Sequence, residues 1–141
     1  MVKLKREKGF SLIELMIVVI IIAALAAMVV PRLAGRSEQA KVAIAKADVN
    51  ANISMALKLY ELDNGNFPSA SQGIAALLTK PSGSPAPTNW NGPYLESEPV
   101  DPWGNPYRYK NPGLHNTTGY DLYSAGKDSH EGTEDDIGNW K

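Results

Sequence analysis

An apolar segment near the amino terminus constrains this chain more than any other feature. From Phe10 to Val30 only Ser11 and Glu14 are polar. As an α-helix this segment would be about 31 Å long, which matches the hydrocarbon core of a bilayer. The preceding flank is basic, since Glu7 alone opposes Lys3, Lys5, Arg6 and Lys8. Basic flanks stay on the cytoplasmic side, so we predict a membrane-spanning helix with its amino end in the cytoplasm.

Two residues distinguish this segment from an ordinary anchor. A secretory signal peptide has its small-residue cleavage site after the apolar region, whereas Gly9 precedes it. Glu14 places a carboxylate inside the apolar run, which costs at least a few kcal/mol and usually requires a specific partner. A cut between Gly9 and Phe10 would create a new α-amine, and the amine of a neighbouring copy could neutralise Glu14. A buried, protonated Glu14 without a role is the alternative.

The run from Lys8 to Met16, KGFSLIELM, resembles the class III signal of type IV pilins and type II secretion pseudopilins. This resemblance implies that a prepilin peptidase removes residues 1–9 and N-methylates Phe10. It also implies that Glu14 is the subunit-docking residue of the assembled filament. Pro31 falls where these proteins carry a helix-kinking proline. Residues 10–31 are then the membrane-spanning half of a helix that forms the filament core.

Composition limits what the remaining residues, 32–141, can be. The chain has 141 residues and a net charge of −1, and the leader carries +3, so the mature side chains sum to −4. This balance excludes a basic surface for nucleic acid. The length suits one small domain, and the absence of cysteine excludes a disulfide, so another staple is expected.

Residues 32 to about 62 are rich in helix formers and predict a continuation of the first helix. One apolar stripe on it is expected to pack on the domain core, namely Val42, Val49, Ile53, Ala56 and Tyr60. A second line on this helix consists of alanines, namely Ala40, Ala43, Ala47 and Ala51. It is expected to be a surface for close helix–helix approach, although it could also belong to the core. The turn signal Asp63-Asn64-Gly65-Asn66 predicts where the helix ends.

Beyond that turn the pattern predicts a short capped helix over 69–78, packing Ile74, Leu77 and Leu78 inward. Residues 81–93 read as a loop anchored by Trp90 and Tyr94. Alternating runs at 107–110 and 119–124 predict an antiparallel pair, with a last short strand at 137–140. The expected fold class is α+β and pilin-like, with a long amino-terminal helix packed on a small antiparallel sheet.

The loop from Ser124 to Asp136 is a candidate metal-binding site because it is strongly acidic. Five acids fall within nine residues: Asp128, Glu131, Glu134, Asp135 and Asp136. Calcium would neutralise them, because it takes six to eight oxygen ligands and accepts carboxylates, hydroxyls and carbonyls together. The spacing is not that of an EF-hand, and a solvated acidic loop is the alternative. His115 and His130 have no partners at zinc-like spacing.

Several stretches are similar to the major pseudopilins of type II secretion systems, and the likeness covers nearly the whole chain. They are YELDNG at 60–65, Gln72-Gly73, DPWG at 101–104 and DDIGNW at 135–140. The resemblance implies one calcium ion, bound by the side chains of Asp128, Thr133 and Asp135 and by the carbonyls of Ala125 and His130. The chain departs from the family at Ser129, where glycine is common, and at Thr133, where serine is frequent. Serine at 129 demands more of the backbone if its φ is positive.

The resemblance implies a structural subunit, not an enzyme, that polymerises into the periplasmic pseudopilus of a type II secretion system. It implies a single-pass protein of the bacterial inner membrane with its carboxy-terminal domain in the periplasm. The expected partners are membrane lipid, prepilin peptidase, an inner-membrane assembly platform, minor pseudopilins and further copies of the chain. The major pilin of a type IV pilus is the alternative, which the absence of cysteine and the acidic loop disfavour. A membrane-anchored enzyme is disfavoured because no catalytic constellation is visible in the sequence.

Overall fold

The computed structural model describes residues 9–140, with the backbone alone described for residues 32–34. Of the predicted leader, only Gly9 falls within the described residues. Contacts divide the chain into two compact units, Met1–Glu38 and Gln39–Lys141. The division falls between Glu38 and Gln39, within the continuous helix, and Glu38 is half-buried. The boundaries expected after residues 9 and 31 stay predictions.

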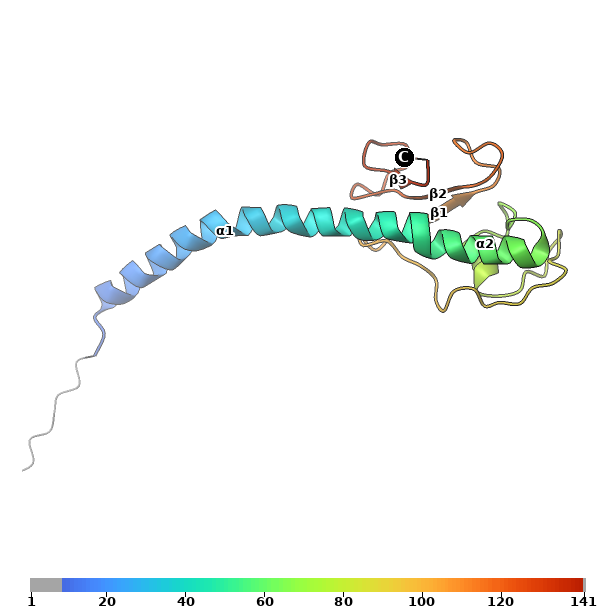
Figure 1. The fold of residues 1–141 in the computed structure, drawn as a ribbon. Helices are drawn as coiled ribbons and strands as arrows, with labels where there is room; N and C mark the ends of the chain where they lie inside the picture. The colour runs from blue at the N-terminus through green and yellow to red at the C-terminus, as the bar shows by residue number, and fades with distance from the viewer. Residues whose placement is uncertain (1–8, 141) are drawn as a thin grey trace, which may run out of the picture. The chain divides into compact units, whose positions relative to one another are not determined.

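Helix α1, Leu12–Ala47, begins in the first unit and is not interrupted at Pro31 (Figure 1). Pro31 therefore does not end the helix, as the sequence predicted. The described side chains from Phe10 to Pro31 are all exposed. By length and composition this helix could cross a membrane. An exposed helical segment that is almost entirely apolar requires lipid or other helices around it.

In the second unit the helix changes its winding before it ends. A π-helical turn, Asp48–Asn52, follows α1 and leads into α2, Ile53–Asn64. The Ser54 hydroxyl donates to the Val49 carbonyl within this region. Gly65 ends α2 in the left-handed conformation, with φ of 80°, and its N–H donates to the Glu61 carbonyl at 2.7 Å. The predicted helix end is confirmed, whereas the π turn was not predicted.

The predicted apolar stripe packs into the core of the second unit. Val49, Ile53, Ala56 and Tyr60 are buried, and Val42 is half-buried. The alanine line is exposed on the same helix, at Ala40, Ala43, Ala47 and Ala51. The apolar stripe therefore faces the core and the alanine line faces outward, as the sequence predicted.

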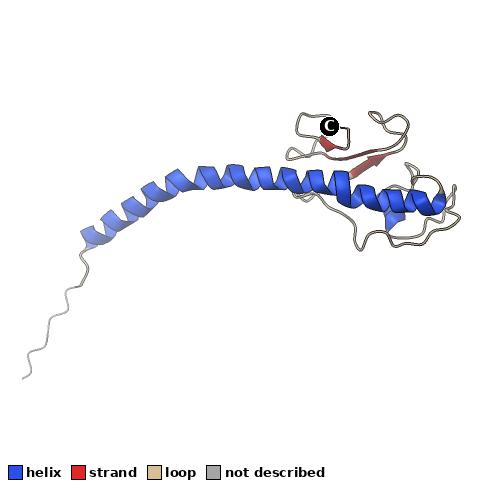
Figure 2. Ribbon diagram, in the orientation of Figure 1, coloured by secondary structure: helices blue, strands red, loops and turns tan. Residues whose placement is uncertain are grey.

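Three short antiparallel strands form the sheet, in the order β1-β2-β3 (Figure 2). They are β1 at Arg108–Lys110, β2 at Asp121–Ser124 and β3 at Ile137–Gly138. Tyr109 pairs with Leu122, and Ser124 pairs with Ile137. Leu122 is fully buried and joins the helix stripe in one core. The predicted α+β arrangement is confirmed.

The segment between α2 and the sheet is mostly irregular. A turn is followed by a short 3₁₀ helix, Ile74–Leu77, rather than by the predicted helix over 69–78. Leu77 and Ala76 are buried while Leu78 is only half-buried, because the tighter 3₁₀ winding turns Ala76 inward in its place. The predicted anchors hold the 81–93 loop, since Trp90 Nε1 donates to the Ala76 carbonyl at 2.9 Å.

Candidate functional site

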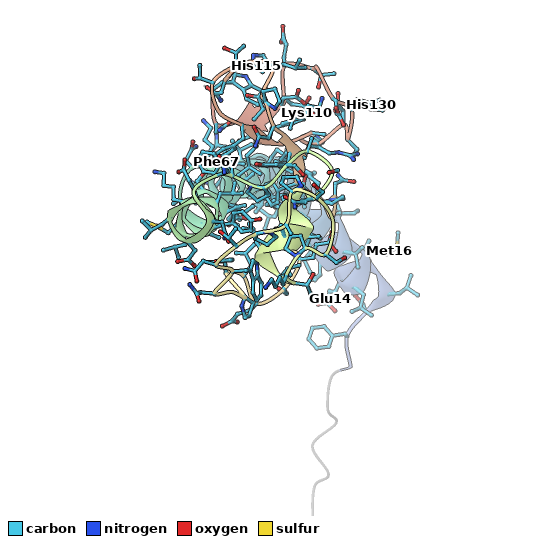
Figure 3. All side chains as sticks on the ribbon, turned by 90° about the vertical axis from the view of Figure 1, so that its right-hand side faces the viewer. Glu14, Met16, Phe67, Lys110, His115 and His130 are labelled. Atoms are coloured by element: carbon cyan, nitrogen blue, oxygen red, sulfur yellow. The ribbon has the colours of Figure 1, made fainter. Side chains whose placement is uncertain are left out.

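The first candidate site is the amino end of α1, where Glu14 makes a reciprocal hydrogen-bonded pair with Ser11. The Ser11 N–H donates to Glu14 Oε2 at 2.7 Å, and the Glu14 N–H donates to Ser11 Oγ at 3.3 Å. This is a capping box, which satisfies two backbone donors at the start of a helix. The Ser-x-x-Glu spacing that signals it was present in the sequence, but Ser11 was not singled out there. Figure 3 shows Glu14 on this helix.

The capping box does not involve the predicted cleavage junction. Both hydrogen bonds join residues that follow Phe10. Phe10 itself is 85% exposed and Gly9 is also exposed. Both residues of the junction are therefore exposed, and the two hydrogen bonds of the capping box lie within the part of the chain that follows it.

The second candidate site is the loop between β2 and β3, where four of the five expected calcium ligands are linked to one another. Thr133 Oγ1 donates to Asp135 Oδ1 at 2.5 Å and lies 3.2 Å from the His130 carbonyl. The Asp128 N–H donates to Asp135 Oδ2 at 3.1 Å. The fifth, Ala125, is buried at the start of the loop. Oxygen atoms of three kinds, carboxylate, hydroxyl and carbonyl, thus converge in this loop.

Glycine is required where the loop folds back on itself. Gly126 has φ of 67°, and a Cβ there would lie 2.5 Å from both the main-chain oxygen and Oδ2 of Asp135. Ser129 has φ of 61°, the costly conformation considered from the sequence. The Asn105 side-chain amide donates to Ser129 Oγ at 2.9 Å and helps to hold it. The serine is therefore accommodated in a conformation that glycine would adopt at lower cost.

The donor set suits a hard cation of variable coordination. Hydrogen bonds from the Thr133 hydroxyl and the Asp128 N–H hold the pKa of Asp135 below its ordinary value, so the carboxylate is charged at neutral pH. Within residues 9–140 no three histidine, cysteine or acidic side chains converge as a metal site. The expected set contains only two carboxylates, Asp128 and Asp135, with its other oxygens from a hydroxyl and carbonyls. Calcium accepts such a mixture, so the residues present fit this ion.

Glu131 makes contacts that the sequence did not indicate. Its Oε1 lies 3.3 Å from Arg108 Nε, and its Oε2 accepts from Lys110 Nζ at 3.2 Å and from the Tyr123 hydroxyl at 2.7 Å. These contacts hold the pKa of the Glu131 carboxyl below its ordinary value, chiefly through Tyr123 and Lys110. We call these four residues the Glu131 clamp. Its partners lie on β1 and β2, and Figure 3 labels Lys110 among them.

His115 packs against an aromatic side chain. Its ring stacks on Trp140, with centroids 4.0 Å apart and planes at 13°. His130 lies in the loop, where its Nδ1 is 2.6 Å from the Asp128 carbonyl. Both histidines thus have local structural partners, as expected from their spacing.

Both the amino-terminal segment and the remaining residues of the chain match known protein families. Residues 32–140 match the family described as type II secretion system protein G, and residues 4–30 match the prokaryotic N-terminal methylation motif. The type II secretion system core protein G of Pseudomonas aeruginosa is 52% identical over 140 residues, covering 96% of each chain. That of Vibrio cholerae is 44% identical over 144 residues, covering 99% of this chain and 96% of its own length.

A solved structure shares the fold. The crystal structure of the major pseudopilin from the type 2 secretion system of enterohaemorrhagic Escherichia coli aligns with a TM-score of 0.68 at 38% identity. The alignment covers 75% of this chain and 87% of that one. The similarity therefore extends from the sequence motifs to the arrangement of helix and sheet.

Proposed function

The chain belongs to the protein G family of type II secretion systems, and from this premise we propose that it polymerises into a periplasmic pseudopilus that drives export of folded proteins. One observation carries the proposal: a protein G domain and an N-terminal methylation motif follow one another in a single chain. The relatives in sequence and in structure are secretion pseudopilins, which favours this role over that of a surface pilus.

Processing at the amino terminus precedes assembly. Prepilin peptidase cuts between Gly9 and Phe10 and methylates the new Phe10 amine. Before assembly, the apolar half of α1 lies across the inner membrane with the basic leader in the cytoplasm and residues 32–141 in the periplasm. The exposed junction and the apolar composition of α1 support this order of events.

Assembly replaces lipid by neighbouring helices around the apolar half of α1. Its exposed side chains leave the bilayer and pack against those of other copies, so their surface remains covered throughout. Glu14 pairs with the Phe10 amine of a neighbouring copy, which compensates part of the cost of burying both charges. Minor pseudopilins, an inner-membrane assembly platform and an energy-supplying ATPase are the further components that this role requires.

A single calcium ion closes the carboxy-terminal loop in place of a disulfide. Asp128, Thr133 and Asp135 supply side-chain oxygens, and Ala125 and His130 supply carbonyls. The ion neutralises the acidic side chains and links residues close to β2 with residues close to β3. The close approach of Gly126 to Asp135 and the convergence of oxygens in the loop support this assignment.

The filament role is tested in the native host. Deleting the gene should abolish secretion of the exported proteins, and the wild-type chain supplied on a plasmid should restore it. Glu14→Ala should accumulate in the inner membrane without restoring secretion. A processed, stable wild-type chain that restores neither secretion nor filaments would contradict the proposed function.

A further inference from the structure

Both carboxylate oxygens of Glu131 contact donors from the sheet. Arg108 contacts one oxygen, and Lys110 and Tyr123 contact the other, at 3.3, 3.2 and 2.7 Å. Arg108 and Tyr123 are paired across β1 and β2, so the donors come from adjacent strands with a common register. A carboxylate held in this way is fastened to the sheet and is not offered to a cation.

Glu131 lies between residues that the calcium site uses. The His130 carbonyl precedes it, and Gly132, with φ of 86°, follows it and leads to Thr133. The Gly132 N–H donates to Asp136 Oδ2 at 2.7 Å. Fixing the Glu131 side chain therefore restricts the backbone on both sides, including the residues that carry two of the expected ligands.

We propose that Glu131 is a positioning residue, which the clamp fastens to β1 and β2 so that the calcium ligands are arranged before the ion binds. This inference rests on the proposed calcium site. It gives different roles to three of the five acids of the loop, because Glu131 organises the site while Asp128 and Asp135 bind the ion. Binding then costs less ordering of the loop, which is how preorganisation increases affinity.

The Tyr123 hydroxyl is the most sheltered contact of the clamp. The side chains of Arg108, Lys110 and Glu131 are 47%, 41% and 42% exposed, so water and salt weaken their ion pairs. Tyr123 is only 4% exposed. Residues that orient metal ligands typically change metal affinity by about 10–100-fold when mutated. For a partly exposed clamp we expect the lower end, about tenfold.

The test is calcium titration calorimetry on the full-length processed chain in detergent micelles. Glu131→Gln removes the charge of the clamp, and Tyr123→Phe removes one hydroxyl without changing charge or the ring contact with Trp140. Glu134→Gln is the matched control for a lost charge in the same loop. Tyr94→Phe is the matched control for a lost hydroxyl, because Tyr94 donates to Asp63 rather than to the loop.

We expect about tenfold weaker calcium binding in Glu131→Gln and Tyr123→Phe, and much smaller changes in both controls. Hydrogen exchange in calcium-free protein should also be faster at the His130 and Gly132 amides of the first two variants. Tighter or unchanged binding in Tyr123→Phe, or equal losses in Glu131→Gln and Glu134→Gln, would overturn the inference. A wild-type chain that binds no calcium would instead overturn the proposed metal site, and with it the role of Glu131 toward the ion.

Discussion

Removal of calcium should destabilise the second unit because the acidic loop joins two strands of its sheet. The loop leaves β2 after Ser124 and enters β3 at Ile137. In the proposed site the ion compensates the charges of Asp128 and Asp135, and without it opening of the loop would release β3 from β2. We therefore expect chelation to lower the melting temperature of the whole unit and not only to loosen a surface segment.

The size of the effect follows from linkage. A ligand that binds only the folded state adds ~2.7 kcal/mol when its concentration is a hundredfold above Kd. A domain of this size has a total free energy of unfolding of about 5–15 kcal/mol, so calcium would supply a large share. Each kcal/mol shifts the melting temperature of a domain of ~100 residues by about 4–8 °C. Chelation should thus lower it by roughly 10–20 °C.

The assay is a thermal melt of the full-length processed chain in micelles, with calcium, with magnesium and with chelator. Near-ultraviolet circular dichroism suits it, because Tyr123 and Trp140 pack edge to face beside the loop, 5.3 Å apart. Magnesium should substitute poorly, since it prefers strict octahedral geometry and retains its water. Asp135→Ala should melt at the chelated temperature in every condition. Three superimposable wild-type curves would refute the reasoning and leave a solvated acidic loop.

Three further predictions concern other parts of the chain. Mass spectrometry of protein from the native host should find a chain that begins at methylated Phe10, and an intact leader in assembled filaments would contradict the proposed processing. Glu14→Ala should reduce filament number and length at least severalfold in electron micrographs without changing the melt of the second unit; normal filaments would show that the pairing is not required. Asp121→Asn should lower the free energy of unfolding by about 3 kcal/mol in denaturant titrations, because the buried carboxylate accepts from the Leu114, His115 and Asn116 N–H groups. Burial alone would raise the pKa of Asp121, but these N–H groups outweigh it and the pKa is lowered. The Asp121 carboxylate therefore contributes its full stabilisation above the unfolded-state pKa of ~4, and this stabilisation is lost as the pH falls through the lower folded-state pKa. An Asn variant that loses stability in acid to the same extent would contradict this account.

The helix, the turns and the strands could be predicted because their signals are local. The 21 positions from Phe10 to Val30, of which only Ser11 and Glu14 are polar, require lipid or other helices around them whatever follows. Gly65 ends α2 because only a residue without Cβ adopts φ of 80° without strain. The alternating runs at 107–110 and 119–124 indicated two strands, although all four residues of β2 are buried rather than alternate ones. The candidate loop was also visible, since five acids fall within nine residues.

Tertiary contacts decided the features that depend on residues far apart in the chain. The π turn coincides with a hydrogen bond from the Tyr107 hydroxyl to Asp48 Oδ2 at 2.7 Å, between residues 59 positions apart. The carbonyl of Ala76, in the 3₁₀ helix, accepts from Trp90 in a later loop, 14 positions away. Glu131 looked like one acid among five until the sheet brought Arg108 and Lys110 to it. Composition and periodicity indicate which side of a segment is exposed to water. They do not indicate which donor from a distant part of the chain contacts a given carboxylate.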